Sequence, residues 1–226
     1  MNKNKIIAII GFCLITINIF LVSVDLMSLN RNFMLKEFVS LKVGETMKIS
    51  NEDLVKIADK MILYFTTDSD ELNLEVSVNG QKQMFFNQRE LDHMVDVKAL
   101  YLNVKLVNLV VGVGFFTILA YLIFSKNLKE LNTKNYFFSL KIMGGILAII
   151  IGYMLIDFNG FWTLFHTLLF NNDLWILNPA TDLLINLVPE KFFFDLCLRI
   201  VYAVIMLLGM VWFALHTVER RKKRAN

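Results

Sequence analysis

The chain has 226 residues, of which 56% are hydrophobic and 20 are phenylalanine, and its mean hydropathy is +0.55. These values exclude an ordinary soluble domain and make the lipid bilayer part of the solvent of this protein. Lys and Arg number 23 against 20 Asp and Glu, a balance too even to predict binding to nucleic acid.

Four stretches are long and apolar enough to cross a bilayer, because a span needs about 20 mostly apolar residues. They cover residues 6–24, 104–124, 137–156 and 196–215. The first follows two lysines, as a signal peptide would, but no small-residue cleavage site comes after it. We therefore expect a retained helix and four spans.

Charged residues near the ends of the spans predict the orientation of the chain. Four basic residues and one acidic residue lie in 125–141, and five basic and one acidic follow from His216 to the end, so both segments should be cytoplasmic. Residues 157–199 hold two basic and five acidic residues and should lie outside. We expect a multi-pass protein of the cell membrane with both termini in the cytoplasm.

This orientation divides the chain into five parts. They are a first transmembrane helix (1–24), an extracytoplasmic cap (25–103), two transmembrane helices with a short cytoplasmic loop (104–156), an aromatic outer loop (157–195), and a last transmembrane helix with a basic tail (196–226). The predicted fold is a membrane all-α fold of four transmembrane helices with a small α+β extracytoplasmic cap.

Three local patterns predict the structure of the cap. Ser50 precedes an acidic pair and apolar residues at helical spacing, which predicts a capped amphipathic helix. Alternation from Leu72 to Phe86 around Asn79-Gly80 predicts a β-hairpin with a type I′ turn. Asn87 with a glutamate three residues later predicts the start of another helix, which holds His93 and could run unbroken into the second span.

The outer loop is unusually aromatic, with nine aromatic residues among residues 158–194. The run FWTLFHTLLF is too short to cross the bilayer, so we expect it to lie at or dip into the outer interface. Asn178-Pro179 predicts the capped start of a short helix that ends near Pro189. An aromatic belt at the headgroup level explains many of these rings but not the histidine among them.

Two of the three histidines fall outside the membrane in this topology. His93 has Glu90 and Asp96 on its helix face, and either carboxylate could fix the imidazole tautomer. His166 has apolar neighbours near lipid, where an ionisable residue indicates function unless it caps a backbone carbonyl. His216 begins the basic tail and is interpreted as structural. We predict that His93 and His166 converge as an acid and base pair.

At these residues the sequence resembles the lipoprotein intramolecular transacylase family. The resemblance rests on HMVDVK, which starts at His93, and on FHTLLFNNDLWILNPATDLLINLVPEKFF, which contains His166, together with the order of spans, cap and loop. It implies four membrane helices, an extracytoplasmic cap and His93 and His166 as catalytic residues. The implied reaction moves the sn-2 acyl chain of a diacylglyceryl cysteine to its α-amine and gives a lyso-form lipoprotein.

The chemistry of this reaction fits the residues present. An imidazole can take a proton from the α-amine, and a second can protonate the departing glyceryl oxygen or stabilise the oxyanion. We assign His93 as base and His166 as acid or oxyanion stabiliser, or the reverse. Residues that could bind or orient the substrate are Asp96, Phe165, Phe170, Trp175, Asn178, Asp182, Phe192, Phe193 and Phe194.

The sequence predicts neither a cofactor nor a metal. It has no G-x-S-x-G elbow, no cysteine paired with an outer histidine and no zinc-ligand spacing. The expected partners are a diacylated lipoprotein and membrane lipid, and the oligomeric state stays open. The alternative is a non-enzymatic membrane sensor or scaffold that binds an envelope partner through its cap; a transporter is disfavoured because the span interiors lack charged residues.

Overall fold

The computed structural model describes residues 2–225, which form two compact units. The span unit contains the residues up to 25, residues 104–157 and the residues from 199 onward. The cap unit contains residues 26–103 and 158–198. Three long helices carry residues of both units, so the chain passes between the units within continuous secondary structure.

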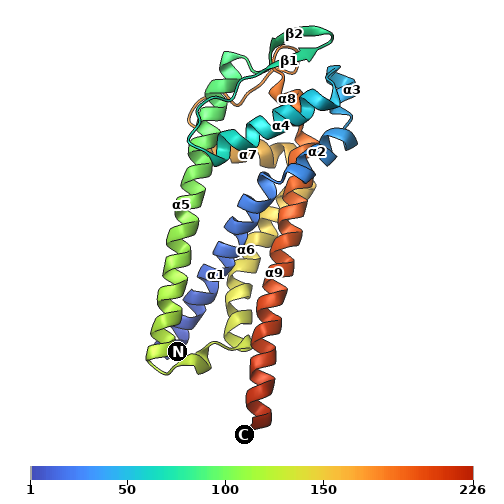
Figure 1. Ribbon diagram of the computed structural model, residues 1–226. Helices are drawn as coiled ribbons and strands as arrows, with labels where there is room; N and C mark the ends of the chain where they lie inside the picture. The colour runs from blue at the N-terminus through green and yellow to red at the C-terminus, as the bar shows by residue number, and fades with distance from the viewer. Residues whose placement is uncertain (1, 226) are drawn as a thin grey trace. The chain divides into compact units, whose positions relative to one another are not determined.

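Within residues 2–225, four helices are long and apolar enough to cross a membrane, as predicted. These are α1 (Lys3–Ser28), α5 (Gln88–Phe124), α6 (Thr133–Ile156) and α9 (Glu190–Ala225). Their apolar parts run side by side in the span unit (Figure 1). A 3-10 helix, η1 (Leu128–Glu130), lies between α5 and α6.

Polar contacts and close packing at a glycine hold α1 against α5. A methyl group on Gly11 of α1 would lie 2.9 Å from Cγ2 of Ile118 on α5, so these helices meet at a glycine. The Asn18 amide donates to Oδ1 of Asn108 at 2.6 Å. Polar groups within a bilayer need partners inside the protein, and Asn108 supplies the acceptors for the Asn18 amide.

The helices alternate in direction. The Tyr121 hydroxyl near the end of α5 donates to Oδ1 of Asn4 at the start of α1, over 3.1 Å. The Thr133 hydroxyl at the start of α6 donates to Oε2 of Glu219 near the end of α9, over 3.0 Å. Both ends of the described chain therefore lie at the same end of the span unit (Figure 1).

The cap unit combines short helices with one hairpin. Its elements besides the first part of α5 and of α9 are α2 (Arg31–Ser40), α3 (Val43–Met47), α4 (Asn51–Thr66), β1 (Glu75–Val78), β2 (Gln81–Met84), α7 (Phe158–Leu169) and α8 (Leu184–Leu187). Helix α4 is the predicted amphipathic helix, because Oγ of Ser50 accepts the N–H of Asp53 at 3.1 Å and the apolar face is buried.

The hairpin is confirmed, but it is shorter than predicted. Asn79 and Gly80 have φ of 53° and 79°, as a type I′ turn requires. The ladder stops at Glu75 opposite Met84. Beyond it, the side chain of Asn73 replaces strand pairing by bonding both the N–H and the carbonyl of Phe86.

The predicted start of α5 is confirmed as a reciprocal cap. Oδ1 of Asn87 accepts the N–H of Glu90 at 3.0 Å, and Oε2 of Glu90 accepts the N–H of Asn87 at 2.8 Å. The helix then continues for 37 residues, far beyond the length of one span. Its first part, residues 88–103, carries all the charged residues of α5 except Lys105 and belongs to the cap unit.

The helix predicted from Pro179 to Pro189 is wrong in extent. The chain makes a turn after Asn178, and α8 covers only Leu184–Leu187. The reason is Asp182, whose carboxylate accepts the N–H of Asn178 at 2.7 Å and the side-chain amide of Asn87 at 2.8 Å. These bonds hold the segment as a closed loop against the start of α5, so a helix does not propagate.

Candidate active site

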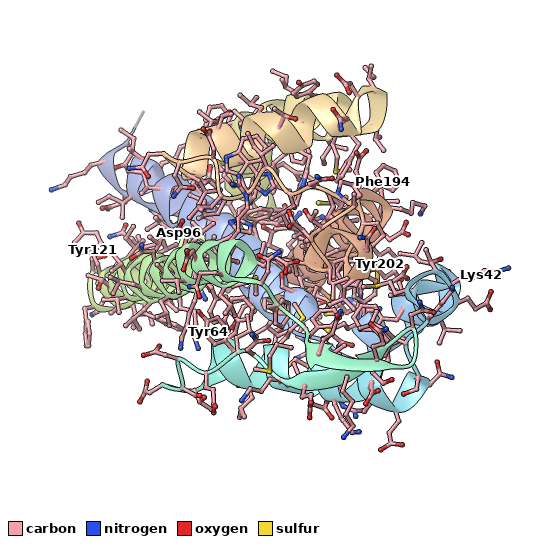
Figure 2. The ribbon with its side chains drawn as sticks, turned by 90° about the horizontal axis from the view of Figure 1, so that it is seen from above. Lys42, Tyr64, Asp96, Tyr121, Phe194 and Tyr202 are labelled. Atoms are coloured by element: carbon pink, nitrogen blue, oxygen red, sulfur yellow. The ribbon has the colours of Figure 1, made fainter. Side chains whose placement is uncertain are left out.

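Two histidines from distant parts of the sequence meet in the cap unit. His93 lies on α5 and His166 on α7, with their ring centroids 6.2 Å apart and each side chain 7% exposed. Asp96, one helical turn beyond His93, marks this part of α5 in Figure 2. The predicted convergence of the two imidazoles is therefore present in the structure.

His166 is held in one tautomer. Its Nδ1 lies 2.8 Å from the carbonyl oxygen of Trp162, one turn earlier on α7. A carbonyl only accepts, so Nδ1 carries the proton and Nε2 keeps its lone pair. Burial lowers the pKa of His166, partly opposed by this hydrogen bond. His166 thus makes the backbone-carbonyl contact of the non-catalytic alternative, but this contact uses Nδ1 alone. The neutral imidazole keeps a basic Nε2 for another group.

His93 is more strongly desolvated. Burial, together with the nearby His166, lowers its pKa to about 4; Asp96 opposes this shift, and Arg89 adds a small further lowering. Its Nδ1 is buried and has no hydrogen-bond partner among residues 2–225. At neutral pH this ring is uncharged and can engage a group that the protein itself does not supply.

The prediction that Glu90 or Asp96 fixes the His93 tautomer is wrong, because both carboxylates bond elsewhere. Glu90 is fully buried and accepts the N–H groups of Asn87 and of Leu184 on α8. Its pKa is raised, chiefly by burial. Oδ2 of Asp96 accepts the side-chain amide of Asn172 at 2.8 Å. Asp96 therefore acts on His93 through its charge and not through a hydrogen bond.

Aromatic rings enclose the two imidazoles. Phe170 lies 5.4 Å from His93 and 5.7 Å from His166, measured between ring centroids. Trp175 stacks on His166 at 4.9 Å, and Trp162 and Phe165 meet it edge-on at 4.6 and 5.4 Å. We call these six residues the histidine site.

Five other predicted site residues lie outside this first ring of contacts. Phe193 packs on Trp162 with ring centroids 4.3 Å apart, and Phe194 packs on Phe158 at 5.3 Å. Phe192 packs on Phe33 and Phe38 of α2, in the interior of the cap unit. Asn178 and Asp182 form the closed loop described above.

Three residues that contribute to the site were not predicted from the sequence. Trp162 lies four residues before His166, and this spacing could have indicated that its carbonyl is within reach of the imidazole. Asn172, in the segment after α7, bonds to α5. Arg89, on α5, bonds to the segment after α7. No local signal in the sequence indicates those pairings.

Within residues 2–225, no group of three or more His, Cys, Asp or Glu side chains lies close enough to bind a metal ion. The arrangement suits proton transfer and hydrogen bonding by uncharged imidazoles between aromatic rings. It defines a multi-pass membrane protein with a paired-histidine site in its cap unit.

The family model described as lipoprotein intramolecular transacylase Lit matches residues 9–193, and the chain belongs to this family. A search of curated proteins finds no match. Among solved structures, the chain is similar to the membrane-integral lipoprotein intramolecular transacylase Lit from Bacillus cereus, at 21% identity, with a TM-score of 0.79 over 99% of this chain and 98% of that one.

Two further structures of the Bacillus cereus protein are also similar. One carries a histidine-to-arginine substitution and matches at 19% identity and a TM-score of 0.78, covering 99% of this chain and 95% of that one. The other carries a histidine-to-alanine substitution and matches at 20% identity and a TM-score of 0.74, covering 96% of both chains. These likenesses confirm the membrane fold with its cap.

Proposed function

We propose that this chain moves the sn-2 acyl chain of a diacylglyceryl cysteine to the α-amine of the same cysteine, using His93 and His166. Its membership of the lipoprotein intramolecular transacylase family makes it an acyltransferase that acts on lipoproteins. The observation that carries the assignment of residues is the pair of buried, uncharged imidazoles 6.2 Å apart in the cap unit.

His166 is the base in this proposal. Its Nδ1–H is engaged by the Trp162 carbonyl, so the free Nε2 can accept a proton from the α-amine as its nitrogen attacks the ester carbon. An α-amine has an ordinary pKa of about 7.7 to 8.0 and must be neutral to attack. The hydrogen bond to Trp162 favours this assignment over the one with His93 as base.

His93 stabilises the developing oxyanion. Since its pKa is about 4, the ring is neutral at the pH of the reaction. The single N–H of this neutral ring can donate to the ester carbonyl oxygen. The nitrogen–carbon bond forms and the carbon–oxygen bond to the glyceryl group breaks. The proton held by His166 then passes to the glyceryl oxygen, which returns His166 to the neutral state, while His93 stays neutral throughout.

The aromatic rings serve to exclude water. Trp175 and Phe170 cover the histidines, and an ester held among such rings is protected from hydrolysis while the amine, tethered to the same cysteine, attacks it. Orientation of two reacting groups can contribute about 7 to 11 kcal/mol to lowering a barrier. No nucleophilic side chain is required, because the substrate carries the nucleophile.

The topology belongs to the same proposal. The basic residues after His216 and in the segment 125–141 favour cytoplasmic locations, which puts both termini inside and the cap outside. The shared end of the span unit where both termini lie is consistent with an even number of crossings. The cap is then on the side of the outer leaflet, where a diacylated lipoprotein is anchored.

The test uses the full-length protein in detergent with a synthetic diacylglyceryl-cysteine lipopeptide that lacks lysine. Transfer within one molecule leaves the mass unchanged, so tandem mass spectrometry must locate the acyl chain on the α-amine. A lipopeptide with an acetylated α-amine is the control and should stay unmodified. Release of free fatty acid without any N-acyl product would contradict the proposal, and an inert protein would favour the sensor or scaffold.

A further inference from the structure

The segment after α7 makes a tight turn that carries one wall of the histidine site. In this turn, Oδ1 of Asn172 accepts the N–H of Leu174 at 3.0 Å, and the carbonyl of Asp173 accepts the N–H of Ile176 at 3.1 Å. Trp175 lies inside the turn and stacks on His166. Because these bonds are local, they define the shape of the turn but not its position against His93.

Two side chains of α5 fix the position of the turn by hydrogen bonding to it. Asp96 accepts the Nδ2 amide of Asn172 at 2.8 Å, and Arg89 donates to the carbonyl oxygen of Asp173. Arg89 and Asp96 are four residues before and three residues after His93, so all three lie on one face of the helix. The turn is therefore attached to α5 at two points that flank His93.

We propose that Arg89, Asp96 and Asn172 are positioning residues, which fix the turn 172–176 on α5 and thereby hold Trp175 against His166. This inference rests on the proposed function of the histidine site. The attachment joins the two parts of the structure that place the imidazoles. Helix α5 carries His93, and the turn carries the Trp175 ring, which stacks on His166. A shift of the turn along α5 changes the space between the imidazoles and the rings that enclose them.

The contacts also rank the two attachment points. Asp96 and Asn172 are both partly buried, and Asn172 uses its amide for α5 and its carbonyl for the turn, so this side chain links the two directly. Arg89 is exposed, and its bond competes with water. Loss of the Asp96–Asn172 bond therefore has the larger effect on the rate.

The variants separate the hydrogen bond from the charge. Asn172→Ala removes the bond to Asp96, together with the bond from the Leu174 N–H, and keeps the Asp96 carboxylate. Asp96→Asn removes the charge and keeps an acceptor for the Asn172 amide. A misplacement of about 1 Å can lower a rate by about 100-fold, so kcat of Asn172→Ala and Asp96→Ala falls by about 10- to 100-fold with a smaller change in KM. Asp96→Asn recovers kcat to within about threefold of wild type.

The double variant Asp96→Ala/Asn172→Ala loses less activity than the product of the two single losses, because both single variants remove the same Asp96–Asn172 bond. Asp92→Ala is the matched control on the same helix, since Asp92 is exposed and its carboxylate accepts the side-chain amide of Gln88, one turn earlier on α5. A readout independent of activity comes from 5-fluorotryptophan labelling. The fluorine resonance of Trp175 shifts or broadens in Asn172→Ala and is unchanged in Asp92→Ala.

The outcomes separate this inference from the function on which it rests. A wild-type protein that moves no acyl chain overturns the proposed function. An active wild type with unaffected Asn172→Ala and an unmoved Trp175 resonance overturns the positioning role alone. A loss in Asp96→Asn as large as in Asp96→Ala, with Asn172→Ala fully active, shows that Asp96 acts only through its charge and also overturns it.

Discussion

His93 should remain uncharged when the pH is lowered from about 8 to about 5, although an ordinary histidine with a pKa of about 6.5 would be almost fully protonated there. The side chain is 7% exposed, and its pKa is lowered to about 4. Burial is the largest cause, followed by the neighbouring His166. Asp96 favours the charged form, and Arg89 opposes it.

The size of the effect follows from the difference between the two pKa values. A lowering from 6.5 to about 4 corresponds to about 3 kcal/mol against the charged ring. At pH 5 only about one His93 ring in ten would carry a proton. Because the unfolded chain binds this proton and the folded chain does not, the contribution of His93 to stability is full above about pH 6.5 and is lost as the pH falls toward about 4.

The assay is a titration of carbon- and nitrogen-labelled histidine by NMR in detergent, with resonances assigned from His93→Gln, His166→Gln and His216→Gln. His93 should give a midpoint near 4, and His166 a midpoint below 6.5 with a nitrogen shift typical of a protonated Nδ1. His216, in the basic tail, serves as the comparison. A His93 midpoint near 6.5 would refute the desolvation argument and the role of a neutral donor.

The pH dependence of the reaction and two stabilities are also predicted. The rate of acyl transfer should rise with pH as the substrate amine deprotonates, near about 7.7 to 8.0, and pH–rate profiles should show no histidine limb above pH 6.5, since both imidazoles have lowered pKa values. Glu90→Ala should lower the free energy of unfolding by about 2 kcal/mol or more, because it leaves two backbone N–H groups unpaired. The control Glu52→Ala, at an exposed position, should change the free energy of unfolding by less than about 0.5 kcal/mol. Thermal unfolding in detergent measures both. Gly80→Ala should cost about 1 kcal/mol through backbone strain alone, because φ is +79° and no atom lies near the added methyl; unchanged melting would contradict this.

The features that were predictable from the sequence depend on neighbours along the chain. The cap of α4 at Ser50, the turn at Asn79 and the reciprocal bonds at the start of α5 each join residues within three positions of each other. Span length and charge at the span ends are likewise local quantities. The two histidines could be paired from the sequence because the predicted topology places both on the same side of the membrane.

The remaining features depend on contacts between distant segments. Asp182 interrupts the expected helix because Asn87, far away in the sequence, donates to it. Asp96 bonds Asn172 instead of His93, and Glu90 bonds the start of α8. A helical periodicity places side chains on a face but does not say which segment covers that face. The partners of charged residues in the cap were therefore beyond the reach of sequence patterns.

The most direct test of the central claim is to locate the acyl chain, by tandem mass spectrometry, after incubating the lipopeptide with His93→Ala, His166→Ala and His216→Ala. If the cap imidazoles perform the transfer, the first two variants lose at least about 100-fold in rate while remaining folded, and His216→Ala keeps the wild-type rate. Rates in His93→Ala and His166→Ala equal to that of His216→Ala would contradict the account.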